Sequence, residues 1–427
     1  MPLPRRSLER AAGLLLASTA LVLVMTCVGS GRLEPRPGRS SEASAPAAPT
    51  VAQSSGLPPA APSVAQGRPK SPDPLGRFHR ALVELGRGER KEHVRVLWLG
   101  DSHTAADYWP EAVRQRLGAR FPGGGPGFVR LGITLYRHGK VNVAVKGRWA
   151  REPGNPASRT RFGDGQFGFA GMRTIPRGPD ATVRVALAPG ATRGGTHWDL
   201  VYRLPTAGSR FRVALDGGVP RPVTDGPGIQ HLELTGSIDG ELALDGMQGA
   251  PEFLGVIVES SQPGVVVDSV GMDGARAGTV LAWDEAAFLE EVRRRGPVLG
   301  IVAFGTNEVM APERPEVFDP DFRGVVERLR RAVPELDCVL VGPTPLEEHG
   351  RTRPRVMAID QLQAHAASEL GCSYFSPYLA MGGEGGYTRW SAESLTAGDG
   401  VHFSPAGYAR LGGLVAELLL QGLDSAP

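Results

Sequence analysis

The spacing of apolar positions along the chain changes twice, and the changes divide it into segments of different character. The first pattern is helical over Phe78–Gly86, continuous over Val94–Leu99, and amphipathic with a helical period over Trp109–Phe121. A short continuous apolar run is typical of a strand buried on both faces. This part of the chain therefore predicts a helix, a core strand and a second helix.

Helical periodicity disappears between Ile133 and Ser260, and short alternating runs replace it. Turn residues separate these runs at fairly regular intervals, which is typical of an all-β sandwich. The predicted strands are Lys140–Val145, Ala181–Leu187, Trp198–Leu204, Arg210–Leu215, Ile229–Thr235, Glu241–Leu244 and Gly255–Glu259.

Strand and helix patterns alternate again after the sandwich segment, which indicates a parallel sheet with helices on both faces. The chain therefore predicts one α/β domain that a β-sandwich interrupts. The predicted strands are Gly264–Val270, Val298–Phe304 and Cys338–Val341, with another short one starting at Cys372, and the predicted helices are Asp284–Arg295, Phe322–Val333, Met357–Leu370 and Pro405–Leu420.

The N-terminal part has the layout of an export signal. Arg5 and Arg6 precede the apolar run Ala11–Met25, so residues 1–30 predict a signal peptide or a membrane anchor. Lipidation at Cys27 is an alternative, because Val24-Met25-Thr26-Cys27 loosely resembles a lipobox. We expect export to the periplasm or cell envelope.

Residues 31–75 are rich in proline, alanine and serine and predict a disordered linker, since they hold too little apolar surface to offset the entropy of ordering. The remaining boundaries place the first part of the α/β domain at 76–132, the sandwich insertion at 133–262 and the second part at 263–427.

The composition argues against some classes of partner and cofactor. The formal net charge of the 427 residues is +2 and the arginines are dispersed, which argues against a nucleic-acid partner. No Cys/His cluster has the spacing of metal ligands, so we expect no metal. Buried free thiols are the simpler interpretation of Cys338 and Cys372, and a disulfide between them is the alternative if the protein is exported.

Candidate functional residues come directly after three of the predicted strands. Gly100-Asp101-Ser102-His103 comes directly after Val94–Leu99, which places a serine hydroxyl where α/β sheets bind ligands. Asn307 comes after Val298–Phe304, where its amide could donate to an oxyanion. The third group is Gly271-Met272-Asp273-Gly274, in which a glycine lets a backbone N–H approach a substrate.

Asp399-Gly400-Val401-His402 stands just before the last predicted helix. An aspartate three residues before a histidine can accept from its Nδ1–H, which leaves Nε2 as a base for a hydroxyl. Turn formation or helix capping would explain each of these groups alone. Together they supply a nucleophile, a base, its orienter and two oxyanion donors, which acyl transfer requires.

The order and identity of these groups resemble the SGNH/GDSL hydrolase family. The resemblance implies a flavodoxin-like three-layer domain and no cofactor. It implies Ser102 as nucleophile, His402 as general base and acid, and Asp399 as its orienter. It also implies an oxyanion hole from the N–H groups of Ser102 and Gly274 and the Asn307 side chain. Gly271 is an alternative donor to Gly274.

The run Gly-Asp-Ser-His is most similar to the peptidoglycan and polysaccharide O-acetylesterase branch, which also carries a jelly-roll-like insertion likened to a carbohydrate-binding module. Asp101 and His103 flank the predicted nucleophile. We interpret Asp101 as a turn former, and His103 as a packing residue rather than a second base. Glu308 is interpreted as a loop stabiliser.

The resemblance implies an exported serine esterase that removes acetyl groups from peptidoglycan or another acylated polysaccharide. A lipase or thioesterase on the same scaffold is one alternative. A glycan acyltransferase or a glycan-binding protein is another, since five aromatic residues of the sandwich segment could stack on sugars, although core packing is the commoner use of such side chains. They are Trp149, Phe167, Trp198, Tyr202 and Phe211.

Overall fold

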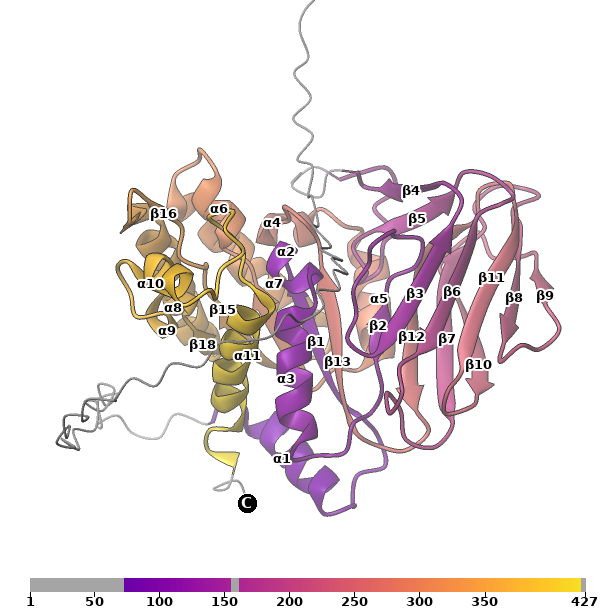
Figure 1. The fold of residues 1–427 in the computed structure, drawn as a ribbon, viewed down its shortest axis with the longest axis horizontal. Coiled ribbons are helices and arrows are strands. Elements are labelled where there is room, and N and C mark those ends of the chain that lie inside the picture. The colour runs from indigo at the N-terminus through magenta and orange to yellow at the C-terminus, as the bar shows by residue number, and fades with distance from the viewer. Residues whose placement is uncertain (1–72, 155–160, 424–427) are drawn as a thin grey trace, which may run out of the picture. The chain divides into compact units, whose positions relative to one another are not determined.

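Five parallel strands form the central sheet in the order β13-β1-β14-β15-β18 (Figure 1). Their bounds are β1 Val94–Gly100, β13 Val265–Gly271, β14 Leu299–Ala303, β15 Asp337–Val341 and β18 Ser373–Phe375. Numbered along the chain this order is 2-1-3-4-5, the doubly wound order in which the connections change direction between the first and third strands. A crevice is expected at that point, beyond the ends of β1 and β14.

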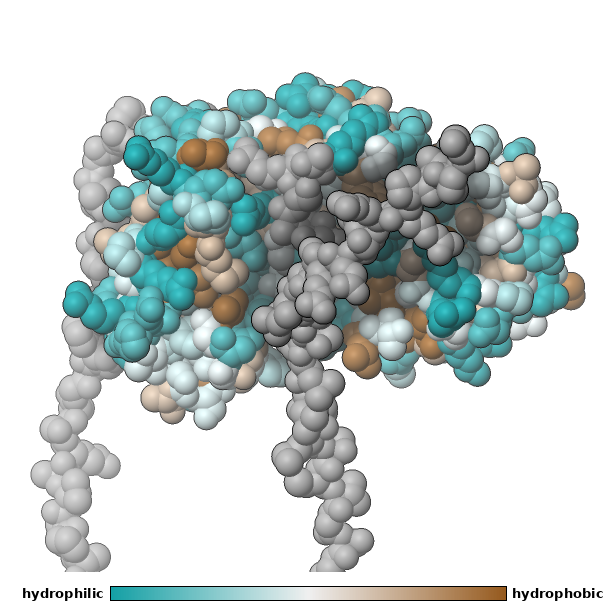
Figure 2. Space-filling view, turned by 90° about the horizontal axis from the view of Figure 1, so that it is seen from above, coloured by the Kyte–Doolittle hydropathy of each residue, from teal (hydrophilic) through white to brown (hydrophobic). Residues whose placement is uncertain are grey.

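The computed structural model describes residues 73–154 and 161–423. The predicted signal peptide, the lipidation site at Cys27 and nearly all of the predicted linker lie outside these residues. Within the described ranges, no helix is both long enough and apolar enough to cross a bilayer. Seen from above, the surface is mainly hydrophilic, with small hydrophobic groups between (Figure 2).

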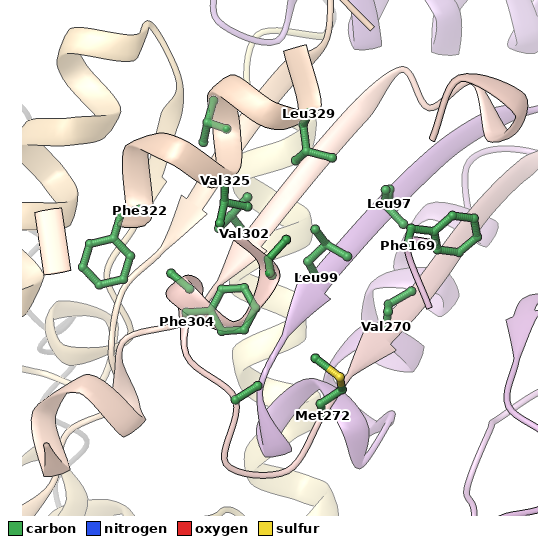
Figure 3. Packing of buried hydrophobic residues seen from close by; sticks show 14 of the residues in the cluster. Leu97, Leu99, Phe169, Val270, Met272, Val302, Phe304, Phe322, Val325 and Leu329 are labelled. Carbon is green, nitrogen blue, oxygen red and sulfur yellow. The ribbon is translucent and has the colours of Figure 1, made fainter. Parts of the chain in front are cut away.

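Helices cover both faces of the central sheet, as the alternating pattern predicted. On one face, α1 (Gly76–Gly86), α3 (Tyr108–Gly118) and α11 (Pro405–Leu420) pack on Trp98 of β1. On the other, α4 (Ala277–Leu281), α5 (Glu285–Arg295), α7 (Asp319–Ala332) and α8 (Pro354–Leu370) share a core with Leu97 and Leu99 (Figure 3). Both faces of β1 are buried, which is why its sequence is continuously apolar. The predicted α/β class is confirmed.

The segment between β1 and β13 holds two antiparallel sheets that pack on a shared apolar core, with Trp198 and Phe211 among its buried residues. One sheet has the order β10-β7-β12-β5-β4, with β2 paired to β12, and the other has the order β3-β6-β11-β8-β9. Their bounds are β2 Gly127–Val129, β3 Val141–Lys146, β4 Trp149–Glu152, β5 Arg173–Pro176, β6 Thr182–Leu187, β7 Thr196–Arg203, β8 Arg210–Leu215, β9 Arg221–Val223, β10 Gln230–Gly236, β11 Glu241–Gln248 and β12 Glu252–Ser260.

The sequence pattern missed β2, β4, β5 and β9, which have only three or four residues each. Runs of that length are too short for alternation to be seen. Of the five sandwich aromatics that could stack on sugars, Phe167, Trp198, Tyr202 and Phe211 are buried in the hydrophobic cores. Core packing is therefore the use that the structure supports for these four.

Short elements complete the fold at the edges of the helices and strands. They are the helices α2 Ser102–Ala105, α6 Thr306–Met310, α9 Pro377–Ala380 and α10 Gly386–Ala392, the 3-10 turn Pro315–Phe318, and the strands β16 Glu347–Glu348 and β17 Arg351–Thr352. Two of them, α2 and α6, follow β1 and β14 directly. They therefore begin at the end of the sheet where the crevice lies.

A buried ion-pair network joins the sandwich to the α/β domain. Arg295 of α5 contacts Glu259 of β12 at 2.6 Å and Asp268 of β13 at 2.6 Å, and Arg95 of β1 pairs with Glu259 at 2.8 Å. Removing one member of such a group would leave an uncompensated charge in the interior, which is strongly destabilising. The network therefore holds the two parts of the described chain in one arrangement.

Cys338 and Cys372 form a disulfide. The simpler interpretation, buried free thiols, was wrong. Cys338 lies in β15 and Cys372 precedes β18, and these strands are neighbours in the sheet. Because that adjacency comes from the order of strands in the sheet, the spacing of the two residues in the sequence could not show it.

Candidate active site

Ser102 begins α2 at the carboxyl end of β1, where the chain turns sharply from strand to helix. Asp101 is the N-cap of α2, and its Oδ1 accepts the His103 N–H at 3.0 Å. The N–H groups of a helix's first turn have no partner within the helix, so such a turn presents donors outward. The strand, the cap and the short helix together place the Ser102 hydroxyl in the crevice.

The Ser102 hydroxyl, the His402 ring and the Asp399 carboxylate form a continuous hydrogen-bonded chain. Ser102 Oγ lies 2.8 Å from His402 Nε2, and His402 Nδ1 lies 2.7 Å from Asp399 Oδ2. A carboxylate only accepts, so Nδ1 carries the proton and Nε2 accepts from the serine. Residues about 300 positions apart in the sequence are thereby in contact.

Hydrogen bonds from backbone N–H groups to the Asp399 side chain close the loop that holds Asp399 and His402. Asp399 Oδ1 accepts the N–H groups of Val401 at 2.9 Å and His402 at 2.8 Å. Although partial burial acts to raise the pKa of Asp399, hydrogen bonds from the His402 backbone and ring and from Val401 lower it to about 2. The carboxylate is therefore ionised at neutral pH and can stabilise a protonated imidazole.

Asn307 is the second residue of α6, directly beyond β14. Its Nδ2 donates to the Ala275 carbonyl at 2.9 Å and lies 3.4 Å from Asp101 Oδ2. Glu308, next to it, is fully buried and accepts the Gly305 N–H at 2.9 Å and the Ala277 N–H at 2.8 Å. Glu308 thus joins the loops after β13 and β14, which agrees with its interpretation as a loop stabiliser.

The two candidate glycines have different surroundings. A Cβ on Gly271 would lie 2.0 Å from the Ala105 backbone nitrogen, so the absence of a side chain there lets α2 pack against β13. Gly274 lies in the following turn with φ of +76°, in the left-handed region that glycine adopts most readily. Both residues line the cavity next to Ser102. Gly271 ends β13, whereas Gly274 lies beyond that strand in the turn.

Asp101 is buried beneath the nucleophile turn. Burial raises the pKa of its carboxyl to about 8. The group is therefore mainly neutral at pH 7. The sequence interpretation of Asp101 as a turn former agrees with its contacts, and its raised pKa could not be read from the motif.

His103 is buried behind the Ser102–His402 pair and does not line the cavity. Its Nδ1 lies 2.8 Å from Tyr408 Oη and its Nε2 lies 3.1 Å from Thr344 Oγ1. Burial lowers the pKa of His103 to about 3, so the ring is neutral. Both nitrogens are engaged and the ring packs 4.9 Å from that of His402, which agrees with a packing role.

A cavity of about 700 Å³ opens at Ser102 and His402. Its walls come from both parts of the fold. The α/β domain contributes Gly271, Gly274, Asn307, Met310 and Val401, and the sandwich segment and its connections contribute Arg130, Ile133, Thr134, Leu135, Tyr136, Arg137, Arg151 and Met172. The volume is within the range of small-molecule sites.

Sequence reasoning missed the contribution of the sandwich segment to this wall. Arg130, Arg137 and Arg151 line the cavity, yet in the sequence they are three of many dispersed arginines. Within the ranges that the structure describes, no group of three or more His, Cys, Asp or Glu residues is arranged to hold a metal ion. The arrangement around Ser102 suits acyl transfer, since a hydroxyl, an imidazole and a carboxylate form one hydrogen-bonded chain beside a cavity that Gly274 and Asn307 also line.

The sequence model of the GDSL-like lipase/acylhydrolase family matches residues 223–410. These residues are therefore similar to that family. GDSL-like hydrolases act on carboxylic esters, and this chain is a carboxylic ester hydrolase. The matched range contains Gly274, Asn307, Asp399 and His402, whereas Ser102 lies before it, on the far side of most of the insertion. No curated protein matches the chain in sequence.

The GDSL hydrolase fold of this chain is shared with a peptidoglycan O-acetylesterase. That structure matches with 21% identity and a TM-score of 0.71, over 82% of this chain and 97% of that chain. A lipase/acylhydrolase from Enterococcus faecalis matches with 19% identity and a TM-score of 0.30, over 38% of this chain and 78% of that one. A family two carbohydrate esterase from Cellvibrio japonicus matches with 11% identity and a TM-score of 0.28, over 66% of this chain and 98% of that one.

Proposed function

We propose that this ester hydrolase removes O-acetyl groups from peptidoglycan or another acylated polysaccharide outside the cytoplasm. The observation that carries the proposal is the unbroken hydrogen-bonded chain from Asp399 through His402 to Ser102 at the floor of the cavity. Such a chain activates a serine hydroxyl that is otherwise a weak nucleophile.

In the proposed reaction Ser102 Oγ attacks the carbonyl carbon of the ester while His402 Nε2 takes the hydroxyl proton. The oxyanion of the tetrahedral intermediate accepts from the N–H groups of Ser102 and Gly274 and from Asn307 Nδ2. The C–O bond to the sugar then breaks, and His402 returns its proton to the sugar oxygen. Water, activated by His402, releases acetate from the acyl-enzyme in a second round of the same steps.

An acetylated glycan is favoured by two observations. The solved structure with the same fold over 82% of this chain is that of a peptidoglycan O-acetylesterase. The cavity is also lined by the guanidinium groups of Arg137 and Arg151 beside its apolar side chains, and these groups could donate to the hydroxyl groups of a sugar. Preference for long acyl chains would favour the lipase or thioesterase alternative instead.

Export is supported by the N-terminal sequence pattern and by the Cys338–Cys372 disulfide. Structural disulfides persist in oxidising compartments and are rare in the cytosol. We therefore propose the periplasm or cell envelope as the location, with an anchor or a lipid at Cys27 as the link to a membrane.

The deciding experiment measures acetate released from purified O-acetylated peptidoglycan, together with hydrolysis of p-nitrophenyl esters of increasing acyl length. Ser102→Ala should abolish both activities, whereas Ser391→Ala, which alters an exposed serine on α10, should leave them unchanged. Transfer of acetyl to an added sugar in place of acetate release would favour the acyltransferase alternative. Turnover by Ser102→Ala at more than a trace would remove Ser102 from the mechanism.

A further inference from the structure

The His103 side chain connects three segments that lie far apart in the sequence. It belongs to α2, directly after Ser102, and its ring is buried. Its Nδ1 lies 2.8 Å from the hydroxyl of Tyr408 in α11, and its Nε2 lies 3.1 Å from the hydroxyl of Thr344, which follows β15. One imidazole ring therefore holds α2, α11 and the loop after β15 together.

The contact with Tyr408 leads to the proposed general base. Burial raises the pKa of Tyr408, while a hydrogen bond from the Phe403 backbone acts to lower it, and the hydroxyl stays protonated. Phe403 directly follows His402, and its ring packs on those of His103 and Tyr408 at centroid distances of 5.8 and 5.5 Å. The Tyr408 hydroxyl thus joins His103 to the backbone of the loop that carries His402.

The contact with Thr344 leads to the proposed oxyanion donor. The Thr344 N–H donates to Thr306 Oγ1 at 3.2 Å, and the two hydroxyl oxygens lie 3.1 Å apart. Both threonines are buried. Thr306 is the first residue of α6 and directly precedes Asn307. The second contact of His103 is therefore continuous with the start of the helix that presents the Asn307 amide.

The hydrogen bonds of His103 are more than packing requires. Burial lowers the pKa of His103 to about 3, so the neutral ring has one donor nitrogen and one acceptor nitrogen. A hydroxyl can donate or accept, so Tyr408 and Thr344 satisfy both nitrogens. An apolar side chain of similar size would fill the same space, but it would leave two buried hydroxyls without this partner, which is costly.

We propose that His103 is a positioning residue, whose two contacts fix the base loop and α6 relative to the nucleophile. The inference rests on the proposed function, because it needs His402 as base and Asn307 as oxyanion donor, but it does not depend on which ester is the substrate. Misplacing a catalytic group by about 1 Å can cost about a hundredfold in rate, so losing one of the two contacts should cost about tenfold. The loss should fall on kcat, since His103 lies behind the reacting groups and outside the cavity wall.

Removing one hydroxyl at a time tests each contact. Tyr408→Phe and Thr344→Val should each lower kcat for p-nitrophenyl acetate by about tenfold, with KM nearly unchanged. In an Asn307→Ala background, Thr344→Val should lower kcat further by less than about twofold, because the amide that it positions is gone. Tyr408→Phe should keep its full effect in that background, because it acts on the base.

His103→Leu separates positioning from packing, because leucine fills the space and makes neither hydrogen bond. Its kcat should fall at least as far as that of either hydroxyl variant, whereas a packing role alone predicts a nearly unchanged kcat. The matched controls are Thr192→Val and Tyr202→Phe. Each removes a hydroxyl of the sandwich that donates to a backbone carbonyl, at 2.9 and 3.3 Å. The controls should lower Tm by a similar amount and leave kcat unchanged.

An unchanged kcat in either hydroxyl variant or in His103→Leu would overturn the inference. A further loss of about tenfold from Thr344→Val in the Asn307→Ala protein would also overturn it. If His103→Leu does not fold, the two hydroxyl variants decide alone. Release of acetate from O-acetylated peptidoglycan tests the proposed substrate separately. Hydrolysis of p-nitrophenyl acetate without that release refutes the proposed substrate and leaves the positioning role to be decided by the variants.

Discussion

Replacing Asn307 by alanine tests whether the arrangement around Ser102 is an oxyanion hole. The Asn307 amide is held by one strong contact, to the Ala275 carbonyl at 2.9 Å, and its approach to Asp101 Oδ2 is longer, at 3.4 Å. One N–H is thus fixed by the backbone, and the other makes only the longer contact to Asp101 Oδ2, which an oxyanion on the bound ester would replace.

The size of the effect follows from this geometry. Removing one preoriented oxyanion donor raises the activation free energy by about 2.7–4 kcal/mol, which is about a hundredfold to a thousandfold in kcat. KM should change little, because the carbonyl of a bound ester is a much weaker acceptor than the oxyanion. The lost contact to Ala275 should lower stability by only about 1 kcal/mol.

Steady-state kinetics with p-nitrophenyl acetate and a melting curve measure both effects. Asn307→Asp keeps the shape of the side chain but replaces the donor by a carboxylate, so it should lose at least as much rate. Asn142→Ala on the exposed side of β3 is the control and should leave kcat and Tm unchanged. A kcat for Asn307→Ala within about threefold of the unmodified enzyme, in a folded protein, would refute the reasoning.

Three further predictions concern other parts of the site and the fold. Asp399→Asn should reduce kcat by about 10⁴-fold, since the wrong His402 tautomer is favoured; a loss below tenfold contradicts this. Asp101, whose pKa is raised to about 8 by burial, is neutral below that pH and ionises above it. Activity should therefore fall above about pH 8 in a pH–rate profile. If the same fall at alkaline pH is measured for Asp101→Asn, Asp101 is not its cause. Cys338→Ser with Cys372→Ser opens a loop with a sequence separation of 34 and should lower the free energy of unfolding by about 3–4 kcal/mol, measured by urea titration; an unchanged midpoint argues against a stabilising bond.

The sequence predicted those features that local pattern determines. The run Val94–Leu99 is apolar on both faces because helices cover both sides of β1, and this alone located the strand that presents Ser102. Asp399 and His402 were predictable as a pair because three residues of loop are enough to bring the carboxylate to the ring. Their meeting with Ser102 followed from the resemblance and not from any local signal.

The features that the pattern missed depend on contacts between distant segments. Nothing around Cys338 or Cys372 says that β15 and β18 are neighbours. Arg137 lies in a connection and Arg151 in a strand of four residues, and neither has a sequence neighbourhood that marks a cavity residue. Such positions become informative only when the cavity that they share is seen.

The path of the chain through the sandwich limits how this protein can be altered. The insertion leaves the α/β domain after α3 and returns through β12 directly into β13, whose end carries the turn with Gly274. Arg137 and Arg151 reach back from the insertion to the same cavity. Excising the sandwich, or exchanging it for another module, would therefore remove part of the wall of the cavity next to Ser102. It would also destabilise β13, the strand that follows the insertion. Truncations meant to isolate a minimal hydrolase should fail for this reason, and variation in specificity among relatives should be sought inside the insertion.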